Sequence, residues 1–214
     1  MSTLFGSADM AKKPDTDWRI ITTALKLGAD EGWRRLTLAR IAEAAKIPLA
    51  DLNARFSSKW AILNGFSLRI DQQALKAAGD DGSSIRDRLF DLIMCRFDTL
   101  HPHKSQLRAI ARDVVPADPI SGLCGLCAMR RAMTKTLEAA GVSTTGLLGR
   151  IKIKALSLAY LDAFRVWLMD DSETQDRVMA RLDKSLARLE HLADTFITPG
   201  RPGGDADAEN ASSA

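Results

Sequence analysis

The chain contains 214 residues, of which 46% are hydrophobic, so it is long enough to bury one large core or two small ones. Its 30 Lys and Arg residues outnumber its 27 Asp and Glu residues by only three, which excludes a protein that coats a polyanion through bulk charge. The three cysteines are an odd set in apolar segments, unlike the disulfide framework of a secreted domain. Without a recognisable export signal or an apolar run of about 18 residues, we expect a cytoplasmic protein that does not associate stably with membranes.

The first predicted element is an amphipathic helix over residues 17–30, because apolar residues recur there three and four positions apart. Gly32 follows the last periodic residue and favours a left-handed end to this helix. Trp33 is expected to pack back on the core. Residues 1–14, before the helix, are expected to form a disordered arm.

Two short helices follow, separated by a tight turn. Thr37 precedes the apolar residues of a helix over 38–45 and is a suitable N-cap. Lys46 and Ile47 form the turn, and Pro48 suits the first turn of a further helix that reaches about Arg55.

The rest of the chain is also predicted to be helical. Ser57 or Ser58 caps a fourth helix that ends near Ala78, and the turn-rich residues 79–84 form a loop before the next helix. Pro, Gly and Asp residues separate further helices at about 85–100, 103–115, 120–140, 145–169 and 173–196. No strand-like alternation occurs, so the predicted fold class is all-α. We divide the chain into a disordered arm (1–14), a helix-turn-helix head (15–60), a helical body for ligand binding and dimerisation (61–197) and a disordered tail (198–214).

The head carries a recognisable motif. The segment TLARIAEAAKIPLADLNARFSSKWAIL resembles the DNA-binding head of TetR family regulators. This family has a threonine that opens the second helix, an Ile-Ala pair within it, and a Phe-x-x-Lys sequence with a leucine after the third. The matching residues are Thr37, Ile41, Ala42, Ala45, Phe56, Lys59 and Leu63. The chain departs from the pattern at Lys46, where the family has glycine, and at Asn53, where it has a tyrosine that contacts phosphate.

The resemblance implies that the helix from Leu49 to Arg55 lies in the major groove of double-stranded DNA. Asn53 and Arg55 have the side chains that read adenine and guanine edges, whereas Asp51 is repelled by phosphates. The predicted DNA-binding residues are Thr37, Arg40, Lys46, Leu49, Ala50, Asn53, Arg55 and Lys59, with Arg34 and Arg35 as further phosphate anchors. Ordinary solvated charges are the alternative for Arg34, Arg35 and Arg40.

A second resemblance concerns residues 142–192. This segment is similar to the lipid-binding accessory family of ubiquinone biosynthesis, which has a TetR-like fold with a degraded DNA-binding head. The resemblance implies an apolar pocket for an isoprenoid lipid. The residues that carry it are Ser143, Thr144, Arg150, Tyr160, Trp167, Leu168, Asp170, Asp171 and Ser172. We do not expect the C-terminal amphipathic membrane helix of this family in residues 197–214, because they are rich in Pro, Gly and Asp.

Small and large apolar residues alternate in the body, which favours either an apolar ligand pocket or a simple helical core. Candidate pocket residues are Phe97, Met129, Tyr160 and Phe164. The TetR resemblance implies that the last two helices pair with those of a second copy. The final helix carries an apolar stripe, which favours a homodimer with a palindromic operator; its members are Leu182, Leu186, Leu189, Leu192 and Ala193.

No catalytic or metal-binding constellation is recognisable. Cys124 and Cys127 form an isolated CxxC pair, which we interpret as two small core residues because a zinc site needs about four ligands. His101, His103 and His191 have no nucleophile at a recognisable spacing. We therefore expect no enzymatic activity, cofactor or metal. The leading hypothesis is a TetR-like repressor that responds to a small apolar ligand, and the alternative is a lipid-binding accessory protein of ubiquinone biosynthesis with a vestigial DNA-binding head.

Overall fold

The computed structural model describes residues 15–77, 84–114, 119–172 and 174–197, and in these ranges every regular element is helical. The all-α prediction is therefore confirmed. The predicted arm and tail, and most of the predicted loop at 79–84, lie outside the described residues. The elements are α1 (Thr16–Leu27), a π-helical turn η1 (Gly28–Gly32), α2 (Leu38–Ala44), α3 (Leu49–Arg55), α4 (Lys59–Ala77), α5 (Ile85–Leu100), a 3-10 turn η2 (His101–His103), α6 (Lys104–Val114), α7 (Pro119–Ala139), α8 (Gly146–Met169) and α9 (Asp176–Ile197).

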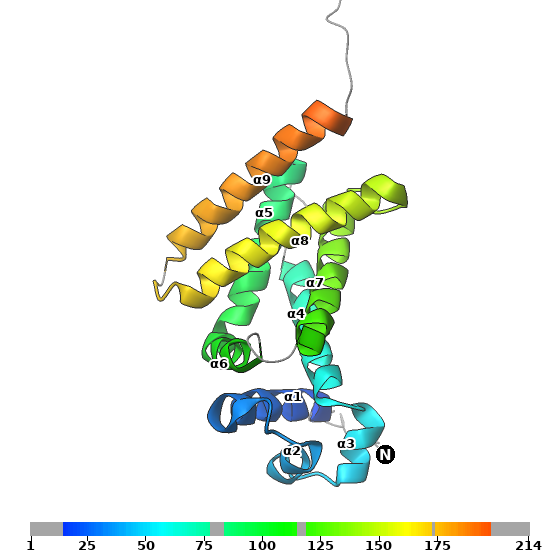
Figure 1. Ribbon diagram of the computed structural model, residues 1–214, viewed down its shortest axis with the longest axis vertical. Coiled ribbons are helices and arrows are strands. Elements are labelled where there is room, and N and C mark those ends of the chain that lie inside the picture. The colour runs from blue at the N-terminus through cyan, green and yellow to red at the C-terminus, as the bar shows by residue number, and fades with distance from the viewer. Residues whose placement is uncertain (1–14, 78–83, 115–118, 173, 198–214) are drawn as a thin grey trace, which may run out of the picture.

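The head and the body lie at opposite ends of an elongated molecule (Figure 1). Helices α1, α2 and α3 form the head, and α4 runs from it into the body. Helices α8 and α9 lie side by side across the far end, and α6 lies between the head and the rest of the body. The long helix α4 therefore belongs to both parts and connects them.

The first helix differs in one respect from its prediction. It ends at Leu27, and the chain continues through the wider turn η1. Trp33 packs directly against Gly28, where a Cβ atom would lie 2.5 Å from the indole ring. The absence of a side chain at Gly28 thus lets Trp33 return to the core, where it is 1% exposed, as predicted. Gly32 has φ +89°, the left-handed conformation that the sequence predicts.

Helix α9 begins three residues later than predicted. Gln175 has φ +54°, which is incompatible with a right-handed helix. Just before it, Asp170 accepts a hydrogen bond from the backbone N–H of Ser172 at 3.1 Å. Local side-chain hydrogen bonding and a left-handed residue therefore delay the start of α9.

Candidate nucleic-acid interface and ligand pocket

The turn between α2 and α3 is built by local interactions. Thr37 Oγ1 accepts a hydrogen bond from the N–H of Arg40 at 3.2 Å and caps α2, as predicted. Lys46 has φ +54°, the conformation for which glycine is better suited. The N–H of Ile47 bonds to the carbonyl of Ala42 at 3.0 Å and closes the turn. Leu52, with no exposed surface, anchors α3 on the head core.

The opposite face of α3 is open to solvent. Leu49, Ala50 and Asn53 are all exposed, and Leu49 is 42% exposed although it is apolar. Asp51 is exposed in the same helix. The structure thus places Leu49, Ala50 and Asn53 on one exposed surface next to the turn, whereas Arg55, two residues after Asn53, lies on another side of α3.

Two predicted DNA-binding arginines are engaged by carboxylates of the head. Arg40 pairs with Glu31 at 2.9 Å and with Glu43 at 3.2 Å, and these hydrogen bonds hold the pKa of Arg40 above its usual value. Arg55 pairs with Asp17 of α1 at 2.6 Å. All of these side chains are at least 40% exposed. DNA phosphates would therefore compete with protein carboxylates for both guanidinium groups.

Lys59 has a structural role that the sequence reasoning missed. Its Nζ donates hydrogen bonds to the carbonyl oxygens of Trp33 at 2.7 Å and Arg34 at 3.1 Å. Burial lowers the pKa of Lys59, and the charge of Asp113 partly opposes this effect. Two of the three ammonium donors are thus directed inward, and contact of Lys59 with phosphate stays a prediction.

Asp113 of α6 links the body to the head. Its Oδ2 accepts a hydrogen bond from the backbone N–H of Arg34 at 2.8 Å. Close by, Ile110 of α6 lies under Gly28 of η1. No sequence signal could have identified this contact, because Asp113 and Arg34 are 79 residues apart and neither belongs to a shared motif.

Three of the four predicted pocket residues form an aromatic cluster. Phe97, Tyr160 and Phe164 stack on one another and on Trp167, with ring centroids 5.4 to 6.5 Å apart. Phe97 and Trp167 have no exposed surface. Met129 packs against the same core from α7 without joining the stack. These contacts are those of a core, the alternative that the sequence left open, and their role in ligand binding stays a prediction.

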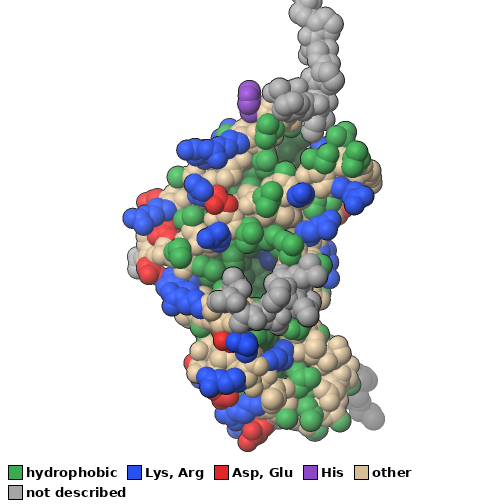
Figure 2. Space-filling model, viewed as in Figure 1, with side chains coloured by type: hydrophobic (Ala, Val, Ile, Leu, Met, Phe, Trp, Pro, Cys, Tyr) green, Lys and Arg blue, Asp and Glu red, His purple; other side chains and the backbone are tan. Residues whose placement is uncertain are grey.

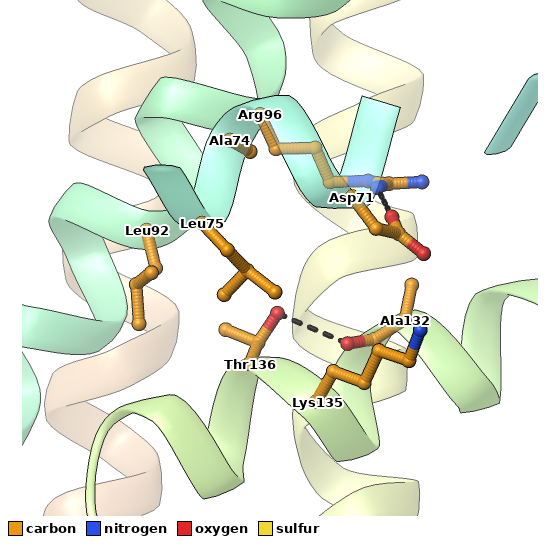
Figure 3. Close-up of a pocket in the computed structure, with 8 residues that line it drawn as sticks. All are labelled: Asp71, Ala74, Leu75, Leu92, Arg96, Ala132, Lys135 and Thr136. Carbon is orange, nitrogen blue, oxygen red and sulfur yellow. Dashed lines mark hydrogen bonds and ion pairs between the residues drawn. The ribbon is translucent and has the colours of Figure 1, made fainter. Parts of the chain in front are cut away.

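A small pocket lies beside this cluster, between α4, α5 and α7 (Figure 3). It has room for about one water-sized molecule. Inside it, Arg96 of α5 forms a buried ion pair with Asp71 of α4. The lining residues are Asp71, Ala74, Leu75, Leu92, Arg96, Ala132, Lys135 and Thr136.

None of the residues that line this pocket was predicted from the sequence, although the sequence carries a signal for two of them. Asp71 and Arg96 lie at helical spacing among buried apolar residues, next to Ile70 in α4 and Phe97 in α5. A charged residue on the apolar face of a helix is normally paired or functional. This exception to the pattern could have indicated the site.

The predicted dimerisation stripe on α9 is partly used within the chain. Leu182 and Leu186 are 0% and 3% exposed, because they pack into the core on α8 and α5. Helix α8 instead exposes large apolar side chains, several of them on one helical face, and the space-filling view shows apolar surface along it (Figure 2). These residues are Leu147, Leu148, Ile151, Leu158, Leu161 and Met169. We call them the α8 apolar surface.

The cysteine interpretation is wrong for Cys127, which is exposed on α7. The sequence does not indicate that Cys127 lies on the outer side of the helix, because its neighbours in the sequence are small and apolar. The side chain of Cys124 lies outside the described residues. Among the described residues, no group of three His, Cys, Asp or Glu side chains is arranged to hold a metal ion.

A helix-turn-helix head on an all-α body defines the class of protein. Residues 20–65 match the model of the family described as bacterial regulatory proteins, tetR family. Among solved structures, a TetR transcriptional regulator from Nitrosomonas europaea has 22% identity and a TM-score of 0.64, with 82% of this chain and 98% of that chain covered. A TetR regulator from Rhodococcus sp. RHA1 has 18% identity and a TM-score of 0.59, with coverages of 81% and 94%.

A third structure similar to this chain is that of Thermus thermophilus FadR, a TetR family transcriptional repressor, in complex with lauroyl-CoA. Its identity is 18% and its TM-score 0.54, with 88% of this chain and all of that chain covered. No curated protein matches the chain.

The head therefore matches the tetR family of bacterial regulatory proteins over residues 20–65, and the fold of the described chain is that of solved TetR transcriptional regulators. The comparisons give no support to the second resemblance, to the lipid-binding family. No described helix is long and apolar enough to cross a membrane.

Proposed function

We propose that the protein is a homodimeric, cytoplasmic transcriptional repressor that binds a palindromic operator and releases it when a small apolar ligand enters the body. The observation that carries this proposal is the exposed face of α3. Leu52 fixes the helix on the head core, while Leu49, Ala50 and Asn53 face solvent. This is the arrangement that a major-groove recognition helix needs.

The charges around α3 support phosphate contact. Arg34, Arg35 and Lys46 are exposed near the start of α2 and at the turn. Arg40 and Arg55 are held in exposed ion pairs, which contribute little to stability because water screens them, and both arginines can exchange their carboxylates for phosphate oxygens. DNA binding does not require a large net charge of the whole chain, which is +3, because these cations lie together on the head.

The α8 apolar surface supports dimerisation. Leu147 is 73% exposed and Leu158 is 59% exposed, and Ile151 lies between them on the same helical face. A second copy that packs on this surface by two-fold symmetry would remove it from water and present two α3 helices to one DNA duplex. Leu158→Glu is expected to convert a dimer into a monomer, as measured by sedimentation, whereas the exposed-to-exposed change Lys184→Glu on α9 is not.

The body can influence the head through two connections. Helix α4 runs from the head into the pocket wall, and α6 holds Arg34 through Asp113. Because the pocket admits only about one water-sized molecule, a larger ligand must separate α4, α5 or α7. Ligand binding would therefore favour a body conformation in which the two heads no longer fit successive major grooves.

The structure of Thermus thermophilus FadR supports the repressor and ligand parts of the proposal. That protein is a TetR family transcriptional repressor, and its structure is a complex with lauroyl-CoA. A similar fold thus accommodates a ligand with an apolar acyl chain. At 18% identity, this likeness extends to the fold alone.

The test is to capture genomic DNA fragments with the purified protein and to titrate the best fragment by fluorescence anisotropy. We expect saturable binding to a palindrome with two chains per duplex. The double variant Asn53→Ala/Arg55→Ala should lose this binding, whereas Lys184→Ala on the far end of the body should retain it. Equal binding by the wild type and the double variant, or no fragment above background, would contradict the proposal.

A further inference from the structure

The pocket contains a charge arrangement that a structural ion pair alone does not require. Arg96 is 8% exposed and Asp71 is 5% exposed, so the pair is almost fully removed from water. Replacement of such a pair by apolar residues is often neutral or stabilising. A buried pair at the wall of a pocket is therefore a candidate for ligand recognition.

Arg96 joins three helices. Its Nη1 contacts Asp71 and its Nη2 donates to Ser67 Oγ at 3.2 Å, and both partners belong to α4. Its Nε donates to the hydroxyl of Tyr160 in α8 at 3.1 Å. The guanidinium group of Arg96 thus connects α5 to both α4 and α8.

The lining of the pocket is polar at one end and apolar at the other. Figure 3 shows Asp71 and Arg96 on one side and the side chains of Leu75 and Leu92 on the other. Lys135 of α7 also lines the pocket and is partly exposed. The lining therefore carries two cations and one anion, and the surplus of one positive charge matches a monovalent anion.

We propose that the ligand is an amphipathic carboxylic acid whose carboxylate replaces Asp71 as the partner of Arg96 and also contacts Lys135. Its apolar part would lie along Leu75 and Leu92. A planar carboxylate matches the two-pronged geometry of a guanidinium group. A phosphate dianion would leave an excess negative charge beside Asp71. This inference rests on the proposed regulator function, because it specifies the ligand of that regulator.

The exchange of partners would act directly on the connection to the head. Asp71 and Ser67 lie on α4, and Phe66 of the same helix stacks on Trp18 of α1 with ring centroids 6.1 Å apart. Once the ligand occupies Arg96, Asp71 must turn to water, since an unpaired buried carboxylate is costly. Helix α4 would then be released from Arg96 and could move together with the head.

The test compares decanoate with decanol, which have the same chain length and differ in charge, by isothermal titration calorimetry. The wild type is expected to bind decanoate at least about tenfold more tightly, the ratio that one charge-assisted hydrogen bond provides. The double variant Asp71→Asn/Arg96→Gln removes both charges without leaving one unpaired, and should lose this preference. Lys135→Gln should weaken decanoate binding severalfold, whereas Lys184→Gln on α9 should leave it unchanged.

Two results would overturn the assignment: equal affinities of the wild type for decanoate and decanol, or a preference retained by the double variant. A thermal melt of the double variant close to that of the wild type establishes that lost binding is not lost folding. Operator binding is measured separately. A protein that binds operator without preferring decanoate contradicts only the ligand assignment, whereas one that prefers decanoate but binds no operator contradicts the proposed function.

Discussion

The head and the body both use arginine–carboxylate pairs, but in opposite surroundings. In the head, Arg55 and Asp17 are 45% and 52% exposed, and the pair connects α3 to α1 at the surface. In the body, the side chains of Arg96 and Asp71 are 9% and 5% exposed and the pair connects α5 to α4 inside the pocket wall. Water surrounds the first pair and is excluded from the second.

This difference in exposure determines which anion can replace the carboxylate partner of each arginine. An exposed pair contributes little because water screens its charges, so a DNA phosphate can replace the carboxylate at low cost. A buried pair depends on its partner, because the loss of either member leaves an uncompensated charge. Only a ligand that brings its own negative charge into the pocket can replace Asp71. The same chemical pair is thus suited to DNA contact in one place and to ligand recognition in the other.

The largest expected effect is that of Arg96→Ala. This change leaves Asp71 buried without a partner and should lower the free energy of unfolding by about 3–5 kcal/mol. Urea denaturation followed by circular dichroism measures it. Arg55→Ala serves as the matched control from the exposed pair. A loss for Arg96→Ala no larger than that for Arg55→Ala would contradict the distinction between the two pairs.

The second largest loss of stability is expected from removal of the N-cap at Thr37 in the head. Thr37→Ala removes the oxygen that accepts the N–H of Arg40 at the start of α2. We expect a loss of about 1 kcal/mol, as is typical of an N-cap. The same denaturation experiment measures it, and Thr37→Ser, which keeps the hydroxyl, should restore most of the stability. If Thr37→Ser is as unstable as Thr37→Ala, the cap is not the cause.

Asp17→Ala is expected to have a smaller effect, and on a different quantity: it should increase operator affinity instead of decreasing stability. The change frees Arg55 for phosphate and removes a negative charge beside α3, so operator affinity should rise by up to about fivefold, while the stability changes by less than about 1 kcal/mol. Anisotropy titration measures the affinity. Asp183→Ala is the control, because Asp183 forms a partly exposed pair with Arg86 in the body at 2.7 Å. An unchanged or lower affinity of Asp17→Ala would show that Arg55 does not contact DNA.

The smallest effect is a pH dependence at the junction of head and body. His103 lies edge-on to Trp18 and Phe66, with ring centroids 5.6 and 5.3 Å apart, and burial lowers the pKa of His103 below its ordinary value of 6.5. As the pH falls below this value, the unfolded chain takes up the proton first. The free energy of unfolding should therefore decrease as the pH falls from 7 to about 5.5.

His103→Gln should make this profile flatter. The carboxylates whose pKa values are held low, such as that of Asp162 by Arg181, lose their contribution only below their ordinary value of 3.8. They do not obscure the histidine effect. A profile that is the same in the wild type and in His103→Gln would contradict the prediction.

Much of the head could be predicted from the sequence because its interactions are local. The cap at Thr37, the turn at Lys46 and the left-handed Gly32 each depend on a few neighbouring residues, and the motif identifies their arrangement. What the sequence could not reveal is the use of its charges. The pairing of Arg55 with Asp17 and the inward direction of Lys59 join residues 38 and 26 positions apart.

The body was predicted well in its helices and less well in its surfaces. Helix α8 is apolar around most of its circumference, so periodicity does not indicate which side faces inward. Helix α9 has a clear apolar stripe, but a stripe does not reveal whether it packs within the chain or on a second copy. Leu182 packs within the chain, and Leu158 of α8 remains exposed. The buried pair of Arg96 and Asp71 depends on the packing of α4 on α5, which no local pattern encodes.

The most direct test of the claim that DNA phosphates replace the carboxylates of the exposed pairs is the salt dependence of operator binding. The logarithm of the binding constant is plotted against the logarithm of the salt concentration between about 50 and 200 mM for the wild type, Arg55→Ala and Arg40→Ala. If each arginine exchanges its carboxylate for a phosphate, each variant should have a slope smaller in magnitude by about 0.9. Slopes equal to that of the wild type would show that these arginines keep their protein partners on DNA and would contradict the account.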